Sequence, residues 1–162
     1  MNRRFWAILN TILFTIVVPD TVAILIPCWL LGGFFRPENT PLAWLGGVVF
    51  ACGAAIYFRC AWEFAVRGLG TPAPIAPTKY LITTALHRYV RNPMYLGVLL
   101  VILGQACIFA SRAILEYAVF VFLCFHLVVV LLEEPHLRSR YPAAYDTFVR
   151  STPRWLGPHR KA

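Results

Sequence analysis

The sequence predicts an all-α membrane protein, a polytopic bundle of about four transmembrane helices with a C-terminal interfacial amphipathic segment. Of the 162 residues, 59% are hydrophobic and only 14% are charged, whereas soluble domains are about half apolar and about a quarter charged. The apolar residues also gather in runs close to the roughly 20 residues that a membrane-spanning helix needs. A soluble fold of this length has too little interior to bury so much apolar surface, so we expect lipid to cover the remainder.

The formal net charge is +8, and the cationic residues flank the apolar runs rather than forming one block. This arrangement favours membrane lipids with anionic headgroups as partners and argues against nucleic acid. The five cysteines are odd in number, and no pair has CxxC spacing. Neither a disulfide framework nor a metal site is therefore predicted.

The first apolar run covers residues 5–35 and is interrupted at Pro19 and Asp20. Because the run is long and lacks a small-residue cleavage pattern, we interpret it as a retained anchor rather than a signal peptide. Proline disrupts a helix interior, so the run predicts either one span kinked at Pro19 or two segments. Asp20 is expected to cap the second half, since aspartate favours helix starts.

The second run, Leu42–Ala61, is expected to form one span. Arg59 and Glu63 lie four residues apart near its end and are predicted to pair. Small residues at four-residue spacing predict the face that a neighbouring helix approaches closely. These residues are Gly47, Ala51 and Ala55.

The third and fourth runs, Met94–Ala110 and Ala113–Leu132, are separated by only two residues. Such a short connection predicts a tight antiparallel hairpin. Gly97 and Gly104 lie seven residues apart on one face of the third run.

Most basic residues outside the runs lie before the first run, between the second and third, and after the fourth. By the positive-inside rule, both termini and the long loop, and with them the active site, are expected to face the cytoplasm. We divide the chain into N-terminal transmembrane helices over residues 1–67 and a cofactor-binding region over residues 68–162. The second region holds the Pro-rich loop, the hairpin and the tail, and the two form one structural unit.

A first polar segment leads into the third run. Asn92 followed by Pro93 predicts the N-cap and first residue of a helix. A helix start offers free N–H groups and partial positive charge to an anion, and Arg88 and Arg91 add cations beside it, with Tyr95 one turn further on. The same pattern also fits a capped helix whose arginines reach the membrane surface.

A second polar segment, Glu133 and Glu134 followed by Pro135, is predicted to end the fourth span. Carboxylates at a helix C-terminus oppose the macrodipole, and broken local rules concentrate at functional sites. Because the hairpin brings this end to the start of the third run, the carboxylates would face the arginines, which suits a zwitterionic ligand. His126 lies on the same face and is expected to form a helix–helix hydrogen bond.

Two further segments bear on such a site. The Pro/Gly-rich stretch Gly68–Pro77 is either a connector or a lid. Aromatic residues of the tail predict an apolar face on a short interfacial helix, which either anchors the chain in the membrane or closes the pocket. They are Tyr141, Tyr145, Phe148 and Trp155.

Three segments of the second half form an ordered set of motifs: GTPAP at Gly70–Pro74, RNPMYLG at Arg91–Gly97, and EEPHLRSRYPAAYDTFVRSTPRWLGP at Glu133–Pro158. Together they resemble the isoprenylcysteine carboxyl methyltransferase and phospholipid methyltransferase family in its small bacterial form. The family patterns are R-H/N-P-x-Y-x-G and E-E-x-x-L…Y…Y…V-P-R-W. The resemblance covers about residues 68–158.

The resemblance implies an integral membrane methyltransferase that uses S-adenosyl-L-methionine and acts on an amphiphilic or lipid-like acceptor, either a carboxylate or an amine. It leaves the catalytic residues unknown. The residues that it implies for cofactor binding are His87, Arg88, Tyr89, Arg91, Asn92, Tyr95, Gly97, Glu133 and Glu134. Those that it implies for the acceptor are Tyr145, Arg154 and Trp155.

Four positions depart from the family pattern. Ala85 and His87 stand where Gly and Tyr are expected, Asn92 stands where some members have His, and Pro142 replaces a Gly. Proton transfer through Asn92 is therefore not assumed. These departures bear on the detailed shape of the pocket.

Two other functions fit parts of the pattern. A sterol-reductase-like membrane enzyme shares a similar arginine-proline-tyrosine motif, but it would bind NADPH, whose extra phosphate conflicts with the paired glutamates. A non-enzymatic membrane scaffold or accessory protein is compatible with the departures. Binding of adenosyl ligands or of NADPH would discriminate among the three.

Overall fold

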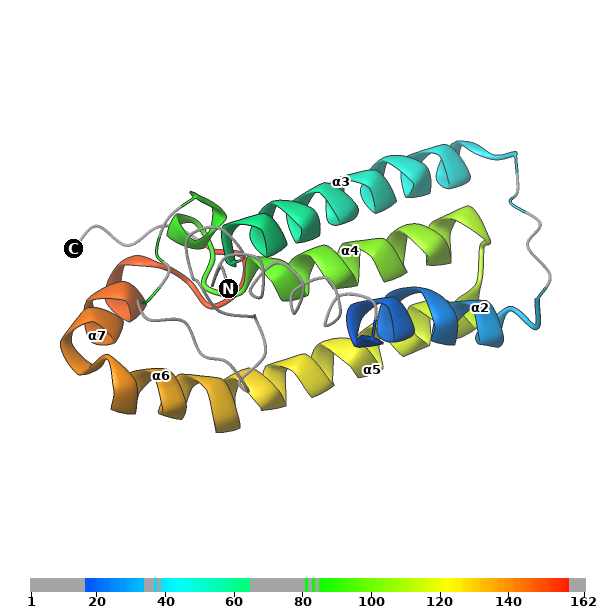
Figure 1. The fold of residues 1–162 in the computed structure, drawn as a ribbon. Coiled ribbons are helices and arrows are strands. Elements are labelled where there is room, and N and C mark those ends of the chain that lie inside the picture. Colours follow the sequence, from blue (N-terminus) through cyan, green and yellow to red (C-terminus); the bar gives the residue numbers. More distant parts are fainter. Residues whose placement is uncertain are drawn as a thin grey trace, which may run out of the picture.

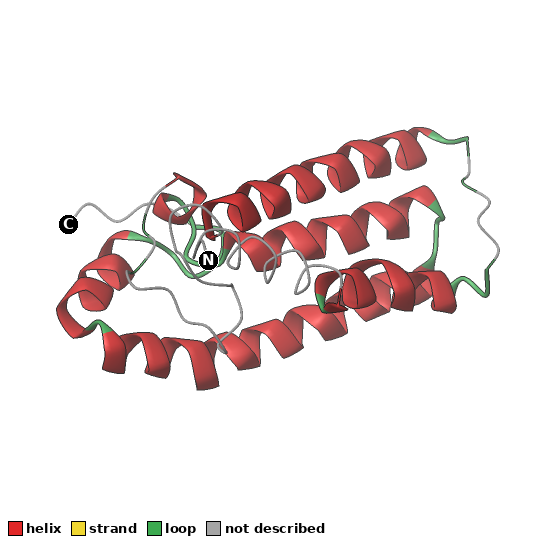
Figure 2. Cartoon of the chain, viewed as in Figure 1, coloured by secondary structure: helices red, strands yellow, loops and turns green. Residues whose placement is uncertain are grey.

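The computed structural model describes residues 17–33, 37, 39–64, 81, 83 and 85–157, and all regular structure within these ranges is helical. The elements in chain order are η1 (Thr21–Leu25), α2 (Ile26–Leu30), α3 (Pro41–Glu63), η3 (Ala85–Arg88), α4 (Pro93–Ile108), α5 (Arg112–Val128), η4 (Val129–Glu133), α6 (Glu134–Arg140) and α7 (Pro142–Ser151). Segments η1 and η4 are π-helical, and η3 is a 3-10 helix. Helices α3, α4 and α5 run side by side, α2 lies along α5, and α7 turns back at one end (Figures 1 and 2). The all-α prediction is confirmed for the described residues.

Within the described ranges, two helical segments are long and apolar enough to cross a membrane, α3 and the continuous stretch Arg112–Arg140. On α3, Trp44 and Trp62 are 73% and 63% exposed, and their 18-residue separation equals five helical turns, or about 27 Å. Tryptophan favours both membrane interfaces, which lie about 30 Å apart. Helix α4 and the segment Thr21–Leu30 are shorter, so the predicted four spans are not confirmed.

The ends of the long helices follow local capping rules. Thr40 accepts a hydrogen bond from the Ala43 N–H at 3.2 Å and precedes Pro41 at the start of α3. Ser111 accepts one from the Ile114 N–H at 3.4 Å at the start of α5. Side-chain oxygens at these positions satisfy N–H groups that have no partner within the helix. The hairpin of α4 and α5 is confirmed.

Asp20 does not cap a helix, contrary to expectation. Its backbone is already α-helical and its side chain makes no capping bond, because helical conformation begins before it, at Val17. Whether residues 5–35 form one span or two stays a prediction, since residues 5–16 lie outside the described ranges.

Helices α3 and α4 meet through glycines whose spacing matches on the two helices. Gly46 packs on Gly104 and Gly53 packs on Gly97, so that a Cβ on Gly46 would lie 2.7 Å from the Gly104 carbonyl oxygen. Gly46 and Gly53 lie seven residues apart on α3, and Gly97 and Gly104 lie seven residues apart on α4. Because glycine has a hydrogen in place of a side chain, the two backbones can touch. The predicted close-approach stripe is wrong, because its members are exposed on the opposite side of α3. They are Gly47, Ala51 and Ala55.

The π-helical segment η1 is held by donors from two other helices. The Ile26 N–H bonds to Thr21 rather than to Val22, and Pro27 has no N–H for Ala23, so two carbonyls lose their helical partners. The Tyr117 hydroxyl donates to the Val22 carbonyl at 2.9 Å. The buried Gln105 Nε2 donates to the Ala23 carbonyl at 2.6 Å. These bonds tie the N-terminal helix to α4 and α5.

Candidate functional site

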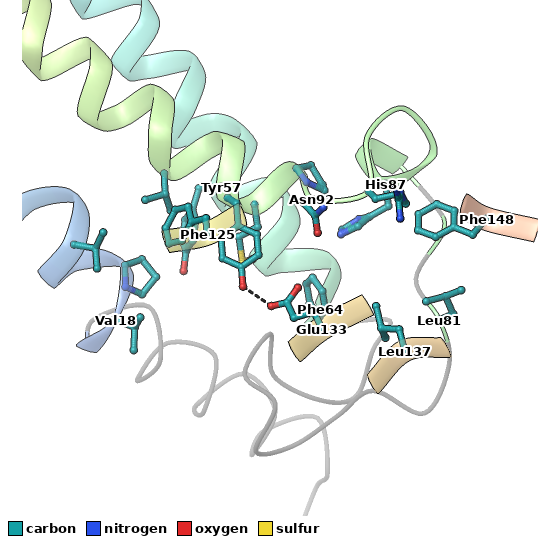
Figure 3. A pocket seen from close by; sticks show the side chains of 17 residues that line it. Val18, Tyr57, Phe64, Leu81, His87, Asn92, Phe125, Glu133, Leu137 and Phe148 are labelled. Carbon is teal, nitrogen blue, oxygen red and sulfur yellow. Dashed lines mark hydrogen bonds between the residues drawn. The ribbon is translucent and has the colours of Figure 1, made fainter. Parts of the chain in front are cut away.

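A cavity lies at the end of the bundle where α3 ends, α4 begins and α5 passes into η4 and α6 (Figure 3). It offers about 190 Å³ to the centres of water molecules, whereas one buried water needs about 10–15 Å³ on that measure. The cavity can therefore hold an organic ligand. Its lining residues are Val18, Pro19, Val22, Tyr57, Phe64, Leu81, His87, Arg91, Asn92, Pro93, Met94, Tyr95, Val98, Phe125, Glu133, Leu137 and Phe148.

The two adjacent glutamates are placed by a π turn that the sequence did not predict. The helix was expected to end here, but it continues through η4 and α6 to Arg140. Pro135 has no N–H and its ring would clash with the carbonyl four residues earlier in a regular helix. The Glu134 N–H instead bonds to the Val129 carbonyl, and this wider turn accommodates the proline. Glu134 then lies in the first turn of α6, so the predicted conflict with the macrodipole is absent.

Glu133 is the carboxylate inside the cavity. Its Oε1 accepts a hydrogen bond from the Tyr95 hydroxyl, which is the dashed contact in Figure 3. Tyr95 also packs on Phe125, with ring centroids 4.5 Å apart. A carboxylate thus lies beside two aromatic rings, and its Oε2 is not used by Tyr95.

Glu134 is not among the residues that line the cavity, and it pairs with two arginines. The guanidinium of Arg154 donates to both of its oxygens, at 2.6 and 2.9 Å, and Arg91 Nη1 donates at 3.0 Å. Arg91 Nη1 also donates to the Tyr145 hydroxyl at 3.3 Å. We call these four residues the clasp. The hydrogen bond to Glu134 raises the pKa of Arg154, while burial, and then the Glu134 charge, raise the pKa of Tyr145.

Backbone contacts attach the tail to the start of α4. The Arg91 N–H donates to the Pro153 carbonyl at 2.9 Å, and the Asn92 amide donates to the Arg154 carbonyl at 3.1 Å. Asn92 occupies the N-cap position and α4 begins at Pro93, as predicted, but the Asn92 side chain makes no capping bond because it is used by the tail.

Two of the four aromatic residues of the tail are buried in the protein interior. Tyr145 and Phe148 of α7 are buried, and Phe148 lines the cavity. Trp155 Nε1 donates to His126 Nδ1 at 3.1 Å, so His126 bonds to the tail rather than to another helix. The sequence left open whether this aromatic face anchors the chain in the membrane or closes the pocket. The structure favours closure of the pocket, because Phe148 lines it.

The residues predicted to bind cofactor or acceptor divide into three groups. His87, Arg91, Asn92, Tyr95 and Glu133 line the cavity. Glu134, Tyr145, Arg154 and Trp155 stand behind this lining, in the clasp and the docked tail. Arg88 and Tyr89 are exposed and stack at 5.0 Å, and Gly97 packs against α3. The Gly68–Pro77 stretch lies outside the described residues.

Sequence reasoning missed one charged group near the cavity, Glu63. It is 2% exposed, pairs with Arg59 at 3.5 Å as predicted, and its Oε2 lies 4.0 Å from Nδ1 of His87. The available signal was a glutamate at the end of an apolar run. Pairing with the arginine four residues earlier explained its charge, so no further role was assigned to it.

The fold and the cavity define a class: a helical membrane protein with a mostly apolar cavity at one end of its bundle, into which a carboxylate, a guanidinium and an imidazole project. A family model described as phospholipid methyltransferase matches residues 41–144. The chain belongs to this family, which confirms the resemblance seen in the sequence and makes the protein a membrane methyltransferase. No curated protein and no solved structure matches the chain significantly.

Proposed function

We propose that this chain is an integral membrane methyltransferase that takes its methyl group from S-adenosyl-L-methionine and transfers it to a lipid-like acceptor. The main support is the family match, which covers both polar segments of the cavity, the start of α4 and the Glu133 turn. Neither the reductase nor the scaffold interpretation has such support.

The side chains present fit a cofactor with separated charges. Arg91 Nε is buried and has no hydrogen-bond partner among the described residues, so a carboxylate could bind it. Glu133 Oε2 could accept from an ammonium or a ribose hydroxyl. The Tyr95 and Phe125 rings offer faces for a heteroaromatic ring or a sulfonium. On this proposal, Arg91 and Glu133 hold the two charged ends of the cofactor.

The cofactor would supply an electrophilic methyl group, and the residues of the chain would align the acceptor with it. Methyl transfer from sulfur is an in-line displacement, so orientation and exclusion of water carry much of the rate. Leu137, Phe148 and Val98 make the cavity wall largely apolar. Such a wall excludes water and leaves the charged groups to fix orientation.

The acceptor is proposed to enter from the lipid side. Val18, Pro19 and Val22, from the segment before α2, line the cavity opposite Phe125 of α5. Val18 is 46% exposed, so this apolar wall continues to the outer surface of the bundle. An acyl or prenyl chain could therefore stay in lipid while its headgroup reaches Glu133.

We further propose four spans, with both termini and the cavity on the cytoplasmic side. The cavity lies at the α3 end that carries Arg59 and Glu63 and at the start of α4, near Arg88 and Arg91. Positive charge at this end favours the cytoplasmic face. Labelling of single cysteines placed in the 37–40 segment and in α7 from each side of a vesicle would test this orientation.

The test is calorimetric titration of the detergent-purified protein with S-adenosylmethionine, S-adenosylhomocysteine and NADPH. Binding of both adenosyl ligands, weakened about tenfold or more by Glu133→Gln, would support the proposal. Glu134→Gln is the matched neighbour, and its effect is expected on the clasp, seen as a lower unfolding temperature. Binding of NADPH alone would favour the reductase, and no binding at all would favour the scaffold.

A further inference from the structure

His87 and Glu63 form a buried pair at the wall of the cavity formed by η3 and the end of α3. His87 is 6% exposed and Glu63 is 2% exposed, and His87 lines the cavity, where Phe64 stands edge-on to its ring. Burying a carboxylate and an imidazole costs free energy that an apolar pair would avoid. At position 87 the family pattern has tyrosine, so this imidazole is one of the departures from that pattern.

The ring of His87 has two distinct sides. Nδ1 is buried, has no hydrogen-bond partner among the described residues, and lies 4.0 Å from Glu63 Oε2. This orientation leaves Nε2 as the ring nitrogen that a ligand in the cavity can reach. The 4.0 Å separation is longer than a hydrogen bond, but such contacts often tighten when a ligand binds. Glu63 thus lies on one side of the His87 ring and the cavity on the other. A histidine held by a carboxylate on one ring nitrogen can accept a proton on the other.

We propose that His87 accepts the proton that an amine acceptor must lose and that Glu63 positions and stabilises His87. This inference rests on the proposed methyltransferase function. A carboxylate acceptor is already nucleophilic and needs no base, so a buried imidazole beside the cavity would have no task.

The proposed step is a proton transfer followed by an in-line methyl transfer. The acceptor ammonium gives one proton to Nε2 of His87, which becomes an imidazolium facing the Glu63 carboxylate. The freed nitrogen lone pair forms the N–CH₃ bond as the S–CH₃ bond of S-adenosylmethionine breaks, and that bonding pair stays on sulfur as a neutral thioether. The His87 proton then leaves to water. An ammonium that enters this apolar cavity loses hydration, which lowers its pKa and eases the first transfer.

In the unliganded protein burial lowers the pKa of His87 to about 4, which keeps the ring neutral near pH 7 but also makes it a weak base. The step therefore requires the contact with Glu63 to tighten when the ligand binds, because a close carboxylate raises the pKa of an imidazole. Among the described residues, the charged groups at or beside the cavity are Glu63 with Arg59 from α3, Arg91 at the start of α4, and Glu133 from η4. Glu63 is the one of these whose contact with His87 is direct, and it would stabilise the imidazolium once formed.

The first experiment needs no turnover. Nitrogen-15 NMR of the detergent-solubilised protein, assigned with His87→Gln, should show His87 neutral at pH 7 with the proton on Nδ1, and Glu63→Gln should remove this preference. His136→Ala is the control, since His136 is exposed on α6 and outside the cavity lining. A His87 protonated on Nε2, or a tautomer that ignores Glu63→Gln, would overturn the proposal.

The second experiment measures radiolabelled methyl transfer to phosphatidylethanolamine and to a long-chain fatty acid in mixed micelles. His87→Ala should lower kcat on the amine by about 10²–10⁴-fold, with S-adenosylhomocysteine affinity within about threefold, and added imidazole should restore part of it. Glu63→Gln should give a smaller loss in kcat. If His87→Ala does not fold, His87→Gln serves, with the thermal unfolding midpoint as the check.

The outcomes separate this proposal from the proposed function. Unchanged kcat in the His87 variants, a loss confined to cofactor affinity, or transfer to the fatty acid alone would overturn the role of His87 while the methyltransferase stands. Failure of the wild type to bind S-adenosylhomocysteine would refute the proposed function. The NMR experiment would then still show whether Glu63 sets which ring nitrogen of His87 carries the proton.

Discussion

Replacing Gly53 by alanine should destabilise the bundle by about 2 kcal/mol. A Cβ there would lie 2.7 Å from both the Gly97 carbonyl oxygen and the Val101 nitrogen. Ordinary contact begins at 3.4 Å, so α3 and α4 would have to separate locally by about 0.7 Å, because backbone atoms cannot rotate away as a side chain can. A gap of that size loses about a quarter to a half of each dispersion contact it opens.

Gly47 supplies the matched control on the same helix. A Cβ at Gly47 meets nothing within 4 Å, so Gly47→Ala should leave stability unchanged or raise it by up to about 1 kcal/mol through better helix propensity. The double variant Gly53→Ala/Gly97→Ala should cost less than the two single changes together, since helices already separated have room for the second methyl.

The assay is unfolding in one detergent, by heat and by denaturant, followed by the helical circular-dichroism signal. The expected order of midpoints is Gly47→Ala at or above wild type, then Gly53→Ala well below it. Equal midpoints for the two variants would refute the packing argument, because both add the same methyl group to the same helix.

Three further predictions concern single sites. Gln105→Leu leaves the Ala23 carbonyl without the donor that now lies 2.6 Å away and should cost about 1–3 kcal/mol in the same unfolding assay; an unchanged midpoint would show that the bond contributes nothing. Ala110, in the turn after α4, has φ of 45°, so Ala110→Gly should stabilise by about 0.5–1 kcal/mol, and a loss of stability would contradict this reading of the turn. In the folded protein the pKa of His87 is about 4, below the ordinary value of 6.5. As pH falls, the unfolded chain therefore protonates His87 first, and the free energy of unfolding drops between pH 6.5 and 4 by up to about 3 kcal/mol. Midpoints measured from pH 7 to 4.5 should therefore fall more steeply for wild type than for His87→Gln, and parallel curves would exclude the effect.

Apolar runs and local caps predicted where α3, α4 and α5 lie, because both signals are carried by neighbouring residues. The face by which α3 meets α4 was predicted wrongly, since four-residue spacing of small residues on one helix does not identify the side that the partner takes. The sequence held a better signal. Gly46 and Gly53 have the same seven-residue spacing as Gly97 and Gly104, and matched spacing on two antiparallel helices allows both pairs to meet.

The continuous helix through Pro135 could not be predicted from proline propensity alone. A proline inside a helix removes one hydrogen bond and crowds the preceding turn, and the usual outcome is a helix end. Here the chain keeps its helix by widening one turn at Val129–Glu133, and it does the same at Thr21–Leu25 before Pro27. The freed carbonyls near Pro27 find donors in α4 and α5, so tertiary contacts make the π turn acceptable at that proline.

Five of the residues predicted to bind a ligand line the cavity, and their binding role stays a prediction, but the contacts of the others were not predicted. The hairpin assigned Arg91 and Glu134 to a zwitterionic ligand, and the resemblance assigned Arg154 to the acceptor. The fold instead pairs Glu134 directly with both arginines, which lie 20 and 43 positions away in sequence. The cavity then offers a ligand Nε of Arg91, the Glu133 oxygen that Tyr95 does not use, and the ring of His87. These three groups differ in charge and come from η3, η4 and the residues just before α4. They therefore restrict the ligand more than a pocket between two arginines and two glutamates would.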